Sequence, residues 1–165
     1  MPPGALMGQS KSISRAVELD DLPGHHIRRL QQIAVALFLQ ETEAFNLTPV
    51  QYAALKGVDA APGIDQRTLA RTIGLDTSTM VGVVERLESR GLVHRGSTRA
   101  DRRVRLLTLT EEGQSVMAKM QPMVNRAQEK ILAPLSKTDR KEFMRMIKVL
   151  VSTNNDLSRA PSEGV

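Results

Sequence analysis

DQRTLARTIGLDTSTMVGVVERLESRGLVHR, residues 65–95, is the stretch that decides the fold of this chain of 165 residues. Asp65 and Asp76 each precede a run of apolar residues with helical spacing, where an aspartate caps the first free N–H groups of a helix. Gly74 and Gly91 follow the two runs, and glycine commonly stands just after a helix end. The stretch therefore predicts two short helices joined by a Gly-Leu-Asp turn, the outline of a helix-turn-helix motif.

The apolar period changes after this stretch. Residues 92–96 (LVHRG) and 104–110 (VRLLTLT) are typical of strands, and the polar residues 97–103 (STRADRR) lie between them. These segments predict a two-stranded hairpin, or wing. The buried faces of the two preceding helices are expected to consist of Leu69, Ala70, Ile73, Met80, Val83, Val84 and Leu87.

Helical patterns lie on both sides of this motif. Residues 22–45 have the spacing of an amphipathic helix, and a helix over 49–60 is marked by a capping box, in which Thr48 caps and Gln51 reaches back. Thr110 caps a long helix that Pro122 should kink. Ser136 caps a last helix that carries Phe143 and Leu150.

The predicted fold class is mainly α with a small β-hairpin, a winged helix-turn-helix flanked by N- and C-terminal dimerisation helices. The expected organisation is a flexible arm (1–20), dimerisation helices (21–46 and 111–157), a winged helix-turn-helix domain (47–110) and a flexible tail (158–165).

Composition excludes several classes of protein. The chain has no cysteine, which removes disulfides, thiolate nucleophiles and cysteine-ligated zinc. No apolar run approaches the roughly 18 residues of a membrane span, and the first twenty residues lack the apolar core of a secretory signal. We expect a cytoplasmic protein with no membrane partner. Aromatic residues make up only 2% of the chain, so stacking on single-stranded bases has little support.

The net charge of +5 is concentrated in one segment. Residues 90–105 hold six arginines and one acid, Asp101, whereas the rest of the chain carries 17 basic and 17 acidic residues. A neutral body with one concentrated basic element suggests a localised contact with a polyanion. The alternative is a solvated arginine loop.

The second helix of a winged helix-turn-helix enters the DNA major groove. Here that helix begins with three short hydroxyl side chains that can meet phosphate or base edges, Thr77, Ser78 and Thr79. Helix phase places Thr79 and Val81 for contact with a thymine methyl group. Simple capping is the alternative for each hydroxyl.

The predicted wing carries the other candidate DNA contacts. They are Arg95 on the first strand and Arg99, Asp101, Arg102 and Arg103 in the loop. An arginine at a hairpin tip suits a phosphate or the negative potential of a narrow minor groove. Asp101 is expected to orient a neighbouring arginine; the alternative is that it makes a turn.

Three segments together resemble the MarR family of bacterial transcription regulators. They are LTPVQYAALKGV (47–58), the stretch 65–95 quoted above and DRRVRLLTLTEEG (101–113). The most specific part is Asp101-Arg102-Arg103 followed by Leu109-Thr110 and Gly113. The resemblance implies a homodimer with two recognition helices that read a palindromic operator in double-stranded DNA. It also implies that Arg103 is the wing-tip arginine.

One residue departs from the family pattern. Members often carry arginine or another polar residue in the middle of the recognition helix, where this chain has Gly82. Glycine inside a helix costs about 1 kcal/mol relative to alanine. Either the backbone approaches DNA closely there or base readout is sparse, so the family's arginine-to-guanine contact is not carried over to position 82. Arg86, one turn later, is the nearest substitute for a guanine contact, and a phosphate contact is the equal alternative.

The resemblance also implies a small-molecule effector, commonly an aromatic acid or a phenol, bound between the dimerisation helices and the DNA-binding lobe. The candidate polar groups on that face are His25, His26, Arg28, Gln51 and Tyr52. A histidine or arginine cation in an apolar cleft would bind the carboxylate of the effector, and Tyr52 would contact the aromatic ring of the effector. The alternatives are a core role for Tyr52 and an exposed helix start for the histidines. The expected function is thus a ligand-released repressor.

Other functions have less support. Only Gly82 favours a winged helix that binds proteins without ligand-controlled DNA binding. The sequence has no Gly-rich phosphate loop, paired carboxylates or Ser/His arrangement, so we expect neither an enzyme nor a cofactor. Adjacent histidines on a helix point about 100° apart and cannot easily share one ion, so we expect no metal site.

Overall fold

The computed structural model describes residues 19–97, 105–158 and 160. The chain divides into two compact units, Met1–Gln32 and Ile33–Val165. Within the first unit, a short 3-10 helix (η1, Leu19–Asp21) leads into α1 (Pro23–Glu41). The Nε2 atom of His26 donates to the backbone oxygen of Asp20 at 2.8 Å, which ties the two helices together.

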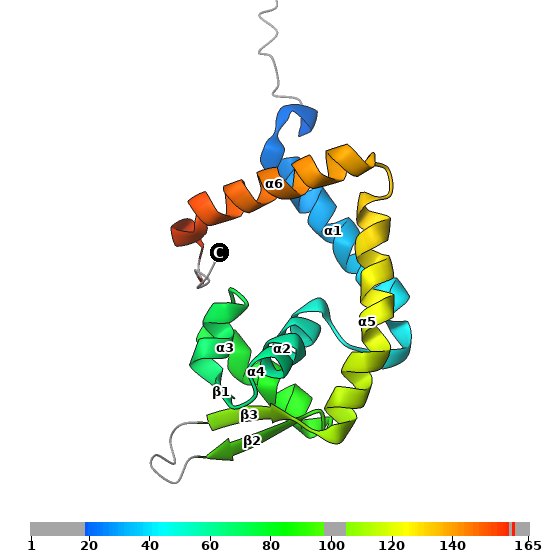
Figure 1. Cartoon of the computed structure of the whole chain (residues 1–165). Helices are drawn as coiled ribbons and strands as arrows, with labels where there is room; N and C mark the ends of the chain where they lie inside the picture. The colour runs from blue at the N-terminus through cyan, green and yellow to red at the C-terminus, as the bar shows by residue number, and fades with distance from the viewer. Residues whose placement is uncertain (1–18, 98–104, 159, 161–165) are drawn as a thin grey trace, which may run out of the picture. The chain divides into compact units, whose positions relative to one another are not determined.

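The second unit begins within α1 and contains the motif predicted from the sequence. Its elements are η2 (Glu43–Phe45), α2 (Pro49–Ala60), β1 (Ile64–Asp65), α3 (Gln66–Thr72), α4 (Thr77–Ser89), β2 (Val93–Ser97), β3 (Arg105–Leu109), α5 (Glu111–Leu132), α6 (Lys137–Thr153) and η3 (Asn155–Leu157). Figure 1 shows this order along the chain. The predicted class, a mainly helical winged helix-turn-helix, is confirmed.

The helix predicted over 22–45 is interrupted near its end. After α1 stops at Glu41, the hydroxyl of Thr42 donates to the backbone oxygen of Phe38 at 2.7 Å, and the chain continues as η2. Asn46 then adopts a left-handed conformation with φ of 48°, which asparagine tolerates better than most residues. The chain therefore turns before α2 begins.

The wing is larger than the predicted two-stranded hairpin. In the described residues the sheet has three antiparallel strands in the order β1-β3-β2, with Ile64 opposite Leu107 and Val93 opposite Leu109. The prediction was incomplete because β1 is only two residues long and shows no alternation of its own. Its pairing comes from contact with a strand about forty residues further along the chain.

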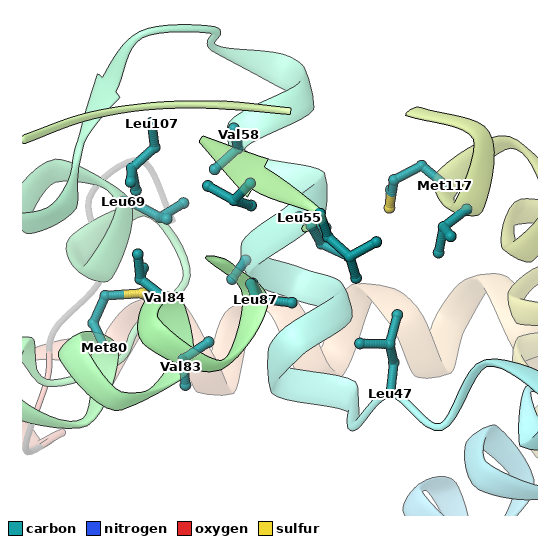
Figure 2. Close-up of a cluster of buried hydrophobic side chains, with 14 of the residues drawn as sticks. Leu47, Leu55, Val58, Leu69, Met80, Val83, Val84, Leu87, Leu107 and Met117 are labelled. Carbon is teal, nitrogen blue, oxygen red and sulfur yellow. The ribbon is translucent and has the colours of Figure 1, made fainter. Parts of the chain in front are cut away.

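The core of the second unit lies between the helices of the motif and the sheet. Figure 2 shows side chains from α2, α3, α4 and β3 in one cluster, joined by Met117 from α5. The predicted inward residues of α3 and α4 are buried there, except Ile73, which packs against the cluster and is half-buried. Because the back of α4 is held in this core, its opposite face is presented outward.

Each predicted helix cap is present. Thr48 and Gln51 form a reciprocal capping box, and Asp65, Asp76 and Ser136 accept N–H groups three residues on.

Thr110 caps α5 and also anchors it. Its hydroxyl accepts the N–H of Gly113 and donates to the backbone oxygen of Gly91 at 2.5 Å. Gly113 lies so close to Leu92 that a Cβ atom there would collide with the Leu92 carbonyl. This close approach fixes the start of α5 against the turn between α4 and β2, and it explains the Thr-x-x-Gly spacing.

No helix in the described parts of the chain is long and apolar enough to cross a membrane.

Candidate nucleic-acid interface

The outward face of α4 is the centre of the candidate interface. Successive residues of an α-helix are rotated by about 100°, so the buried Met80, Val83, Val84 and Leu87 define its back. The row opposite to them contains Ser78, Gly82, Glu85 and Ser89. The motif thus presents short and polar residues along a helix whose orientation is fixed by the core.

The hydroxyl groups at the start of α4 serve its cap. Ser78 donates to Oδ1 of Asp76 at 2.5 Å, and Thr79 donates to Oδ2 at 2.7 Å. The backbone N–H of Thr79 also reaches Asp76 at 2.8 Å. The capping alternative therefore describes Ser78 and Thr79 in this structure. Thr77 is exposed beside them.

Two further candidates lie at the sides of this face. Val81 is 38% exposed and leaves an apolar contact surface. Arg86 is exposed one turn later. Both side chains lie beside the outward row of α4.

Arg95 lies on β2, but it faces the recognition helix. Its Nη2 atom is 3.1 Å from Oε2 of Glu88, and its side chain is 18% exposed. Among the described residues, its Nε atom has no hydrogen-bond partner. The ion pair joins the last turn of α4 to the sheet, so Arg95 has an intramolecular partner as well as its predicted role toward DNA.

Arg90, which contributes to the basic segment, is also engaged within the chain. Its Nη1 donates to the backbone oxygen of Asn46 at 2.6 Å, and its Nη2 donates to that of Phe45 at 2.7 Å. Sequence reasoning missed this contact because the partners are more than forty residues away. Arg99, Asp101, Arg102 and Arg103, the predicted contacts of the wing loop, lie outside the described residues.

The candidate effector residues are divided between the two units. His25, His26 and Arg28 belong to the N-terminal unit, where His25 is half-buried and the other two are exposed. Gln51 is buried, and its side-chain oxygen accepts the backbone N–H of Thr48 in the capping box. Its side-chain amide oxygen is therefore engaged in helix capping.

Tyr52 belongs to a polar cluster between α2 and α5. Its hydroxyl donates to Oε1 of Gln121 at 3.3 Å, and Nζ of Lys56 donates to the same oxygen at 3.1 Å. Gln121 in turn donates to Asn125 at 2.9 Å. We name Tyr52, Lys56, Gln121 and Asn125 the α2–α5 polar cluster. The family resemblance pointed to Tyr52, whereas no sequence pattern pointed to Lys56, Gln121 or Asn125, because α2 and α5 lie more than sixty residues apart in the chain.

The surroundings of Tyr52 change its chemistry. Its ring centroid lies 5.8 Å from that of Phe38. Burial raises the pKa of the Tyr52 hydroxyl, and the nearby charge of Asp59 raises it further. Tyr52 thus offers a hydrogen-bond donor beside the ring of Phe38, and Nζ of Lys56 donates to the same Gln121 oxygen as the Tyr52 hydroxyl.

A helix-turn-helix with its second helix exposed, followed by an antiparallel wing, defines a winged-helix DNA-binding transcription regulator. A family model described as "MarR family" matches residues 45–104. The transcriptional regulator HosA of Escherichia coli is 33% identical over 129 residues, which cover 78% of this chain and 94% of HosA. The chain belongs to the MarR family of transcription regulators.

Solved structures agree with this assignment. The PcaV transcriptional regulator of Streptomyces coelicolor, in complex with its natural ligand, has 38% identity and a TM-score of 0.78, and the match covers 83% of this chain and 96% of PcaV. The transcriptional repressor CouR, bound to a 23-mer DNA duplex, has 30% identity and a TM-score of 0.77, with 82% and 96% covered. CouR has also been solved with p-coumaroyl-CoA.

Proposed function

We propose that this chain is a cytoplasmic, homodimeric repressor that binds a palindromic operator and leaves it when a small aromatic acid or phenol binds. The observation that carries the proposal is α4, a capped helix whose apolar back is fixed in the core while its polar front is exposed. That arrangement suits insertion into a major groove of double-stranded DNA.

The exposed apolar residues of α6 support a homodimer. Met144, Met146, Val149, Leu150 and Val151 are each between 41% and 55% exposed. Among the described residues, none in α6 is buried. An amphipathic helix gains most of its stability from a covered apolar face, and a second copy of the chain supplies that cover.

Recognition then involves two copies of each reading element. The two α4 helices enter successive major grooves of a palindrome through Thr77, Val81 and Arg86. Ser78 and Thr79 reach phosphate only where a phosphate oxygen replaces Asp76 as the acceptor of their hydroxyl protons. The wing follows the backbone with Arg95, Arg99, Arg102 and Arg103, and Asp101 orients a neighbouring arginine. The wing arginines supply much of the affinity because phosphate contacts release counterions.

The α2–α5 polar cluster supports the effector part of the proposal. A CouR structure contains p-coumaroyl-CoA, whose acyl group is phenolic, and a PcaV structure contains that protein's natural ligand. In this chain Tyr52 offers a hydroxyl next to an aromatic ring, and Lys56 offers a cation for a carboxylate. His25, His26 and Arg28 are the candidates from α1.

The DNA-binding part is tested with the purified full-length chain and a fluorescent duplex from the region upstream of its own gene. Sedimentation should give a dimer, and anisotropy should give a Kd in the nanomolar range at physiological salt that weakens steeply as salt rises. Binding that does not respond to salt, or a monomer at micromolar concentration, would contradict this part.

The effector part is tested on the same complex with 4-hydroxybenzoate, salicylate and phenol as probes. One of them should release the DNA, and Tyr52→Phe, which keeps the ring, should raise its half-effective concentration about fivefold through the lost hydrogen bond. Cyclohexanecarboxylate, which has the charge but no aromatic ring, is the matched control. Release by none of the aromatic probes would remove this effector class and leave the DNA-binding part intact.

A further inference from the structure

Gly82 stands in the middle of the exposed row of α4, between Ser78 one turn before and Glu85 nearly one turn after. Glycine inside a helix is unfavourable because it loses more backbone freedom on folding than other residues. Its place in the middle of α4 therefore costs helix stability, and a packing or conformational reason for the glycine would offset that cost.

Among the described residues, neither reason is found for Gly82. Apart from its two chain neighbours and the backbone of α4 itself, no described atom lies within 4 Å of a Cβ atom built there, and Gly82 is not among the residues with positive φ. Gly57 and Gly113 differ, because a Cβ atom on them would press on Leu69 and on the Leu92 carbonyl. A Cβ atom at Gly113 would meet backbone that cannot rotate away and one at Gly57 would displace the Leu69 side chain, whereas the space beside Gly82 is open.

We propose that Gly82 is a specificity-determining residue, a notch in α4 that receives the 5-methyl group of a thymine in each operator half-site. The inference rests on the proposed function, because it takes α4 as the helix that enters the major groove. Thymine presents the only methyl group on the major-groove edges of the four bases. Without a Cβ atom at the centre of the face, the helix backbone can approach that methyl group directly.

The side chains around the notch favour an apolar group. Ser78 and Thr79 precede Gly82 by one turn, and both of their hydroxyls donate to Asp76 instead of pointing a free proton at a base. Val81, next to the notch, is 38% exposed and adds methyl groups of its own. This side of Gly82 therefore offers apolar contact and little hydrogen bonding.

On the other side of the notch, Glu85 is exposed at the following turn. A carboxylate there accepts hydrogen bonds from amino groups, which adenine presents at N6 and cytosine at N4, and it repels the N7 acceptor of either purine. Glu85 therefore does not distinguish an A·T pair from a G·C pair, and the preference at the notch comes from the thymine methyl group, which only an A·T pair presents.

The test begins with binding sites selected by the wild-type dimer from a random duplex library. Each thymine of the selected operator is then replaced by deoxyuridine, which lacks only the methyl group. The wild type should lose on the order of fourfold in affinity, the value of one buried methyl group, at one thymine in each half-site. Thymines outside the half-sites serve as the control and should show no loss.

Gly82→Ala supplies the second arm. It should raise the melting temperature by about 2–4 °C, since alanine is the better helix former, and bind the selected operator at least about fivefold more weakly. Its affinity for non-specific duplex should be unchanged. At the sensitive thymine, it should no longer distinguish thymine from deoxyuridine.

The outcomes separate the two proposals. If the wild type selects a palindrome but Gly82→Ala binds it equally well, or keeps the same deoxyuridine sensitivity, the notch is overturned and the proposed function stands. If the wild type selects no sequence from the library, the proposed function is contradicted, and so is the role of Gly82 that rests on it.

Discussion

The Nη1 atom of Arg90, at the end of the recognition helix, donates to the backbone oxygen of Asn46 at 2.6 Å. The second nitrogen of the same guanidinium holds the neighbouring oxygen of Phe45. Both oxygens lie where the chain leaves η2 and turns toward α2 in a left-handed conformation. One side chain therefore connects the C-terminal end of α4 to the segment that joins α1 to α2.

Replacement of Arg90 should destabilise the protein by removing these two bonds. Arg90→Ala should lower the free energy of unfolding by about 1 kcal/mol, since the side chain is exposed and hydrogen bonds of this kind have modest net value. Arg90→Lys can make one of the two bonds and should lose less. Urea unfolding of the three proteins at equal concentration checks the order, and equal stabilities would contradict the contact.

Gly113 should tolerate no side chain. Gly113→Ala places a Cβ atom against the Leu92 carbonyl, which belongs to the backbone and cannot rotate away. We expect a loss of about 2 kcal/mol in the free energy of unfolding. Gly82→Ala makes the same chemical change in open space and serves as the control, with an expected gain. A neutral result for Gly113→Ala in urea unfolding would show that α5 can shift without cost.

Asp65 should make the stability depend on pH in a predictable direction. Hydrogen bonds from the Thr68 side chain and backbone hold the pKa of the Asp65 carboxyl below its ordinary value. The ionised Asp65 carboxylate therefore adds its full contribution to the free energy of unfolding at pH values above the unfolded pKa of about 4. This contribution is lost as the pH falls through the lower pKa of the folded state.

The measurement compares wild type with Asp65→Ala in urea at several pH values. The wild type should be more stable by about 1 kcal/mol at pH 7, the usual value of an N-cap, and the difference should shrink below about pH 4. Asp65→Asn keeps an acceptor without an ionisable group, and its stability relative to Asp65→Ala should stay constant with pH. A wild-type advantage that stays constant down to pH 3 would exclude the linkage.

Arg103, in the predicted wing loop, should act through charge. Arg103→Ala should weaken binding to every duplex and reduce the slope of log K against log salt by about one. Arg103→Lys keeps the charge and should keep the slope. Anisotropy titrations at four salt concentrations distinguish the two variants, and a sequence-dependent effect of Arg103→Ala would mean that the residue reads bases instead.

The local features of the fold were predictable because their partners lie close in the sequence. A helix cap joins residues three positions apart, so Asp65, Asp76 and Thr110 are recognisable without any tertiary information. The same holds for the apolar period that buries one face of α4. By contrast, β1 consists of two residues whose strand character comes only from pairing with β3.

The amino-acid sequence by itself determined that this chain is a winged helix-turn-helix with a short, hydroxyl-rich recognition helix, because caps, glycines and periodicity act over one or two turns. Only the tertiary structure decided what Arg90 and Arg95, the two arginines of the basic segment whose side chains are described, contact. In the folded chain, Arg90 donates hydrogen bonds to two backbone carbonyl oxygens, and Arg95 forms an ion pair with Glu88. It also revealed that the space beside Gly82 is open. Such contacts depend on how distant segments of the chain pack together. The periodicity of apolar residues along the sequence does not predict that packing.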